Sequence, residues 1–151
     1  MKIFPSVADA SILEQFQSPL GKTLMNHAFN TCGIEQHLAV ASVLCPEIIE
    51  VKGYILISEF YNGNIDRIEN QFDFDRKKIE QFINSWSLGD FFLLSRDESV
   101  ENEILFEQFG KVLQHFWRMR FNELFPNREI IVELGYGVMG ENGLTITVYQ
   151  K

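Results

Sequence analysis

The clearest pattern of hydrophobic and polar positions lies between Ser99 and Phe125. At about 100° per residue, apolar side chains of this segment gather in one sector of a helical wheel that starts at Leu105. The sector contains Phe109, Val112, Leu113, Phe116 and Met119, and its edge contains Phe106, Trp117 and Leu124. The pattern predicts a central helix of roughly 40 Å, at about 1.5 Å per residue, with its apolar side in the core.

The chain begins with further helix signals. Ser11 and Glu14 have the spacing of a capping box, and Ser18-Pro19 supplies an N-cap residue followed by proline at the first helical position. From Pro19 onward, apolar side chains recur every fourth residue as far as Cys32-Gly33. Glycine suits a helix end there, because it tolerates the left-handed conformation that often terminates helices.

The segment from Ile34 to Leu44 fits either a second helix or a strand. It contains Val40 and Val43, which suit a strand, and the period of a short apolar run does not decide between the two. Pro46 ends the element in both cases.

Extended structure is predicted from Glu47 to Tyr61, a segment rich in β-branched and aromatic residues. We expect two strands that turn at Lys52-Gly53, since glycine supplies the positive φ that hairpin turns need; a single bent strand is the alternative. The polar residues Asn62 to Asn64 then interrupt the pattern, and they can cap a short helix from Ile65 to Gln71.

A further helix is predicted after Asp73 or Asp75, either of which can act as its N-cap. Its apolar face consists of Ile79, Phe82, Ile83 and Trp86, at helical spacing. Phe91 to Leu94 suggests a short buried strand. Ser95 with Glu98, or Ser99 alone, is placed to cap the central helix that follows.

The last part of the chain alternates with a period of two. Ile130, Val132, Leu134 and Tyr136 share one face of a predicted strand, and Leu144, Ile146 and Val148 share one face of the next. The glycine-rich segment between them has the composition of a hairpin loop. Together the elements predict an α+β fold in a single globular domain over residues 1–151, with an antiparallel sheet of about four strands packed on the central helix.

Charge narrows the classes of partner. The chain has 21 acidic and 13 basic side chains and a net charge of −8. Such a surface repels phosphate backbones and anionic membranes, so we expect neither nucleic acid nor a membrane as a partner. Its first consequence is solubility, and it also suits a basic partner protein.

The sequence also predicts the cellular compartment of the protein. The N-terminal sequence has no basic region followed by an apolar one, and the longest apolar or small run, Leu38 to Cys45, is far shorter than the ~20 residues of a membrane span. Two cysteines, Cys32 and Cys45, are too few for a disulfide framework and suit a reducing compartment. We therefore expect a cytoplasmic protein, although a bridge between the two cysteines remains an alternative.

No motif of the sequence names a reaction. His27, Cys32, His37 and Cys45 are chemically suitable zinc ligands, but their spacing differs from that of known zinc sites, so we expect no metal and no cofactor. A thiolate pair of one cysteine with a histidine depends on the fold. The sequence contains no nucleophile elbow, dinucleotide fingerprint, phosphate-binding loop or zinc-protease motif.

The end of the central helix interrupts its own apolar sector, because Arg120 and Glu123 project into it. Either they form an exposed pair on a last turn that has left the core, or the aromatic end of the helix lines a cleft or contact patch. The candidate ligand- or partner-binding residues are His115, Trp117, Arg118, Arg120, Phe121, Glu123 and Tyr136.

Three functions are compatible with the sequence. The first is a small acidic interaction module, of the inhibitor or immunity type, that binds a basic protein. The second is a small-molecule-binding domain or enzyme with a pocket between sheet and central helix. The third is a homo-oligomer that associates through an edge strand or the aromatic helix end. We favour interaction over catalysis and leave the ligand, the partner and the oligomeric state open.

Overall fold

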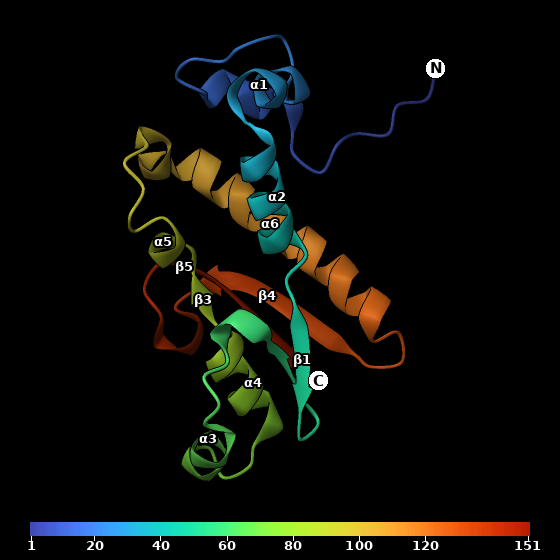
Figure 1. The fold of residues 1–151 in the computed structure, drawn as a ribbon, viewed down its shortest axis with the longest axis vertical. Helices are drawn as coiled ribbons and strands as arrows, with labels where there is room; N and C mark the ends of the chain where they lie inside the picture. Colours follow the sequence, from blue (N-terminus) through green and yellow to red (C-terminus); the bar gives the residue numbers. More distant parts are fainter.

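The computed structural model describes residues 1–151 and shows an α+β fold (Figure 1). The helices are η1 (Ala10–Gln15), α1 (Leu24–Thr31), α2 (Ile34–Leu44), η2 (Ser58–Phe60), α3 (Ile65–Gln71), α4 (Arg76–Asn84), α5 (Leu88–Phe91), η3 (Glu98–Glu101), α6 (Glu103–Leu124) and η4 (Val138–Gly140). The strands are β1 (Ile48–Val51), β2 (Tyr54–Ile57), β3 (Trp86–Ser87), β4 (Ile130–Tyr136) and β5 (Leu144–Gln150). The predicted fold class is confirmed, including the long helix packed against strands.

The strands form two antiparallel sheets, where we expected one sheet of about four strands. β1 pairs with β2, and a three-stranded sheet has the order β3-β5-β4. β3 pairs with only Thr145 and Ile146, so one edge of β5 continues beyond it without a strand partner. Side chains of α4 bind that edge and the edge of β2, and they hold the two sheets together.

Glu80 and Asn84, one turn apart on α4, make this connection. The Glu80 carboxylate accepts hydrogen bonds from the backbone N–H groups of Ile55 in β2 and Gln150 in β5, at 2.8 and 2.6 Å. The Asn84 side chain accepts from the N–H of Ile57 and donates to the carbonyls of Ile55 and Val148. Both side chains are fully buried, and they replace the ladder that β2 and β5 would otherwise form directly.

The long helix begins later than predicted. The 3₁₀ turn η3 precedes it, and the Asn102 side chain caps α6 by accepting from the N–H groups of Ile104 and Leu105. Ser95 and Ser99 therefore do not act as its N-cap. Asp97 instead caps η3 by accepting from the N–H of Ser99.

The buried face of α6 is rotated from the predicted sector. Its buried residues are Gly110, Leu113, Trp117 and Phe121, whereas Phe109, Val112 and Phe116 are half-buried and Met119 is exposed. Gly110 permits this rotation of α6 about its axis. A Cβ at that position would lie 3.1–3.2 Å from the side-chain tips of Leu88, Leu134 and Leu144. The helix thus approaches the sheet most closely where it lacks a side chain.

The structure decides two alternatives that the sequence left open, and it confirms the predicted hairpin. Ile34–Leu44 is a helix rather than a strand, and Asp75 rather than Asp73 caps α4 by accepting from the N–H of Lys78. The hairpin turns at Lys52 and Gly53, whose φ values of 51° and 85° match the primed turn that a two-residue hairpin favours.

Three local predictions are wrong. The segment from Phe91 to Leu94 is not a buried strand: it ends α5, and Leu93 and Leu94 are exposed. α1 begins at Leu24, with Thr23 rather than Ser18 as its cap. The Ser11 capping box does not form, because Asp9 caps the 3₁₀ turn there by accepting from Ser11. In the two helices a different side chain acts as the cap: Thr23 accepts from the N–H of Asn26, and Asp9 accepts from that of Ser11.

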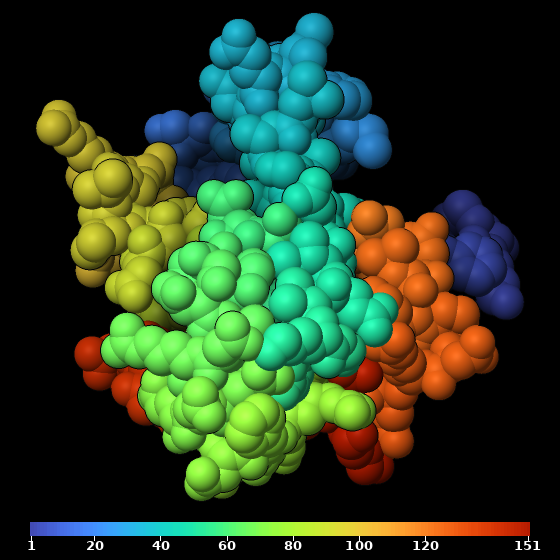
Figure 2. Space-filling model, turned by 60° about the horizontal axis from the view of Figure 1, so that its bottom comes forward, coloured from blue at the N-terminus to red at the C-terminus, as the bar shows by residue number.

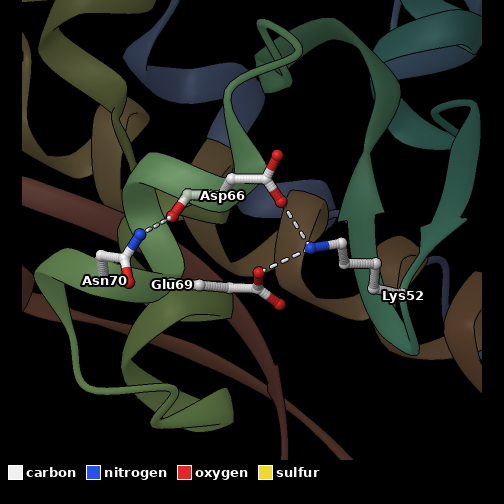
Figure 3. Close-up of polar contacts among 4 residues, drawn as sticks. All are labelled: Lys52, Asp66, Glu69 and Asn70. Atoms are coloured by element: carbon white, nitrogen blue, oxygen red, sulfur yellow. Dashed lines mark hydrogen bonds and ion pairs between the residues drawn. The ribbon is translucent and has the colours of Figure 1, made fainter.

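The β1–β2 hairpin is attached to α3 through its turn (Figure 3). The Lys52 ammonium lies 2.5 Å from an Asp66 carboxylate oxygen and 2.7 Å from one of Glu69. The hydrogen bond with Asp66, and then that with Glu69, raise the pKa of Lys52 well above its usual value. None of the helices combines the length and the hydropathy that crossing a membrane requires.

We predict that Asn84→Ala lowers the free energy of unfolding by about 3 kcal/mol or more, because buried backbone groups of β2 and β5 lose their partners. Urea unfolding followed by circular dichroism measures this change. Asn70→Ala is the matched control: Asn70 is exposed and donates only to the carbonyl of Asp66 (Figure 3), so its loss should cost less than about 0.5 kcal/mol. Similar effects of the two substitutions would show that Asn84 does not join the sheets.

Candidate functional site

The two aromatic candidates at the end of α6 are core residues. Trp117 and Phe121 are 1% and 0% exposed. The Trp117 indole N–H donates to the carbonyl of Val43, 2.9 Å away, and so connects the end of α2 to α6. These side chains hold elements together and present no surface to a partner.

The polar candidates on the same helix point in different directions. Arg118 donates to the carbonyl of Val132 in β4, at 3.3 Å, and His115 is exposed beside the ring of Phe116. Arg120 lies 3.5 Å from Glu123, so the predicted i, i+3 pair forms. The last turn has not left the core, however, because Phe121 is fully buried and the Nε of Arg120 is buried without a partner. The structure does not gather these residues around a cavity.

Tyr136 lies at the other end of α6. Its hydroxyl is 3.5 Å from the Glu107 carboxylate. Glu107 precedes Arg120 by 13 positions on the helix, which corresponds to about 20 Å along the axis. Tyr136 therefore belongs to a different surface from the remaining candidates.

That surface contains the larger of two neighbouring hollows. A cavity of about 560 Å³ lies between the N-terminal segment, α1, η3 and the first half of α6. Its apolar residues include Ile12, Phe16, Leu24, Phe92, Leu105, Phe106, Phe109 and Val112. Its polar residues include Gln15, Gln17, His27, Asp97, Glu98 and Asn102. The cavity thus combines an aromatic and aliphatic lining with carboxylates and amides.

A second hollow of about 410 Å³ lies beside the first, between α5, η3 and the end of β4. Phe92, Val100 and Phe106 line both hollows and form the wall between them. Tyr136 lines the second hollow, together with Leu93, which is largely exposed. The predicted pocket between sheet and central helix is therefore replaced by two hollows at the N-terminal end of α6.

Five exposed carboxylates lie at or beside these hollows. Asp97 and Glu98 line the larger one, Glu101 and Glu103 line the smaller one, and Glu107 contacts Tyr136 of the smaller one. Neither hollow is lined by lysine or arginine. We call this surface, the five carboxylates with the two hollows beside them, the acidic end. The arrangement is suited to hold a group that combines positive charge with apolar surface, because the carboxylates provide the charge and the aromatic and aliphatic lining residues provide apolar contacts.

Hydrogen bonds fix the N-terminal segment across the larger cavity. Gln17 donates to Glu98 at 2.7 Å, and Asn102 donates to Gln15 at 3.4 Å. Hydrogen bonds from the hydroxyl and the backbone N–H of Ser99 lower the pKa of Asp97, so this carboxylate remains charged at neutral pH. The acidic end is therefore preorganised and negatively charged.

The histidines and cysteines have local roles. His27 accepts from the N–H of Leu20 and packs against the edge of the Phe16 ring, and His37 contacts the carbonyl of Gly33. Cys32 and Cys45 are exposed and free.

The acidic end was missed by sequence reasoning, which considered the negative charge only as a total for the chain. A signal was present: the segment from Asp97 to Glu107 contains five acidic side chains and no basic one. A charge run of this kind usually marks a solvated helix face, and only the fold places aromatic hollows beside it.

Comparisons of the chain with protein-family models, with curated proteins and with solved structures found no match.

We predict that Tyr136 reports the negative potential of the acidic end. Desolvation of the hydroxyl and the charge of Glu107 raise its pKa above the usual 10. Glu107→Gln should lower that pKa, because the charge that disfavours tyrosinate is removed. Absorbance titration at 295 nm measures it, with Tyr136→Phe identifying which of the tyrosines is observed. A pKa of Tyr136 that Glu107→Gln leaves unchanged would contradict the contact.

Proposed function

We propose that this protein is an interaction module that binds a basic partner protein at its acidic end. The observation that carries the proposal is that four exposed carboxylates, and no lysine or arginine, line two hollows that share aromatic and aliphatic residues, with a fifth carboxylate, Glu107, beside them. Charge of one sign steers a partner of opposite sign, while the apolar lining residues can supply the desolvated contacts that contribute most affinity.

The two hollows favour a polypeptide as the ligand. They share one wall, formed by Phe92, Val100 and Phe106, so a single segment can place an apolar side chain on each side of it. Leu93 and Leu94 are exposed next to that wall and extend the apolar surface. Lysine or arginine side chains of the same segment can then reach Glu101 and Glu103 at the rim.

An inhibitor or immunity protein is the kind of interaction module that we favour. Such a protein covers a functional surface of its target. A preorganised acidic surface is suited to cover a basic one, because it loses little conformational entropy on binding. We place the protein in the cytoplasm as part of the proposal, since the exposed free thiols of Cys32 and Cys45 suit a reducing compartment.

The proposal predicts that a peptide of alternating leucine and lysine binds the protein, and that Glu101→Lys/Glu103→Lys weakens this binding at least about tenfold. The change places cations where the peptide's lysines are expected. Fluorescence anisotropy of the labelled peptide measures the dissociation constant, which should also rise with salt.

The control is Glu47→Lys/Glu59→Lys, which changes the net charge equally at two exposed glutamates outside the acidic end. It should affect binding far less. Equal weakening by both double substitutions would show that the change in net charge alone weakens binding, and it would contradict a localised site. Equal binding of a peptide of alternating leucine and glutamate would also contradict it.

The size of the larger cavity supports a second candidate function. About 560 Å³ lies within the range of small-molecule sites, and Glu98 provides a carboxylate at its rim. A ligand for this cavity would be an organic cation with an apolar body.

For this second candidate we expect 2-phenylethylammonium to raise the melting temperature, because a ligand that binds only the folded state stabilises it. The neutral analogue 2-phenylethanol should not do so, and Glu98→Gln should abolish the effect of the amine. Differential scanning fluorimetry measures these shifts. Equal shifts with the alcohol, or none with either compound, would exclude a cation site.

A further inference from the structure

The helices α1 and α2 form an arm, residues 19–45, that projects from the rest of the molecule (Figures 1 and 2). Neither helix contains a buried residue. Apolar side chains along the arm are instead exposed: Phe29 of α1 is 70% exposed, and Ile34 and Leu38 of α2 are 79% and 68% exposed. Ile34 and Leu38 are one turn apart and therefore lie on the same face of α2.

A short helix with an exposed apolar face needs a partner surface that buries this face. α2 has 11 residues, and isolated helices of that length are marginal in water even with favourable sequences. Most helices of folded proteins are stabilised by burial of one apolar face, which the first turns of α2 lack within their own chain. The exposed face accordingly has the composition of an interface.

The arm is held in a defined direction at its base. Val43 and Leu44, in the last turn of α2, pack against the hydrophobic core. The indole of Trp117 donates to the carbonyl of Val43 and fixes the same turn. The apolar face of α2 is therefore presented in one orientation, which limits the ordering that association requires.

The charge of the arm indicates which kind of partner can bind the apolar face of α2. From Ser18 to Cys45 the chain contains one lysine and one glutamate, although its net charge is −8. A basic partner would find almost no carboxylate to pair with on the arm. A second copy of the chain would find almost no like charge to repel it, which is not true of the acidic end.

The symmetry of a homodimer agrees with association through this face. In an isologous dimer the same surface on both copies forms the contact, so an apolar face with few charges is complementary to itself.

We propose that the protein forms a homodimer in which the α1–α2 arms of two copies cover each other, with Ile34 and Leu38 in the contact. The dimer surface differs from the acidic end, and the inward side of α1, with Leu24 and His27, lines the larger cavity of a single copy. The dimer therefore does not depend on the proposed basic partner.

Sedimentation equilibrium of the whole chain, over about a hundredfold range of concentration, tests the proposal. We expect twice the chain mass at the upper concentrations. Leu38→Glu should raise the dimer dissociation constant at least about tenfold, because it places a carboxylate in the apolar contact. Leu38 is exposed in the single chain, so this substitution should leave the fold intact, as circular dichroism can verify. Ile34→Glu should act in the same way.

The matched control is Met119→Glu, which places the same charge at an exposed apolar residue of α6 outside the arm and should leave the dimer unchanged. Hydrogen exchange adds a local measurement: the amides of α2 should become protected as the dimer forms, and not in Leu38→Glu. A monomer at every concentration would overturn the proposal. A dimer that Leu38→Glu and Ile34→Glu do not weaken, or that Met119→Glu weakens equally, would overturn it as well.

Discussion

The hydrogen bonds of Glu80 and Asn84 are the constraint on which the rest of the structure depends. They take the place of a strand ladder between β2 and β5, so both sheets are oriented by one helix turn of α4. α4 packs closely against β5, and even Thr145 and Thr147 of this strand are fully buried. Low dielectric strengthens these bonds, and it makes the loss of any one partner costly.

Local chemistry was sufficient to predict much of the fold. The turn at Lys52-Gly53, an aspartate N-cap of α4 and the period-two pattern of β4 each depend on residues close in sequence, and each is present in the structure. Of the two aspartates that the sequence offered, Asp75 is the cap. The division into two sheets could not be predicted, because it depends on Glu80 and Asn84. In the sequence these are ordinary polar residues of an amphipathic helix, and only tertiary packing places them between two strand edges.

The candidate site was harder to predict than the fold, for two physical reasons. α6 has apolar residues around much of its circumference, so its periodicity did not determine which of them face the sheet; Gly110 decides this by allowing close approach there. Trp117 and Phe121 consequently became core. The acidic end joins residues of η3 and α6 to the N-terminal segment through contacts such as Gln17 with Glu98, which are distant in sequence and carry no local signal.

The distribution of charge connects the two proposed surfaces. Repulsion between two acidic copies is smallest where charges are absent, and the arm, with one lysine and one glutamate, satisfies that condition. The segment from Asp97 to Glu107 has the opposite property, since its carboxylates oppose self-association and attract cations. Two contacts of different chemistry can thus operate on one small chain without competing. A dimer through the arms would present two acidic ends, so a partner with two basic segments could gain avidity from binding both.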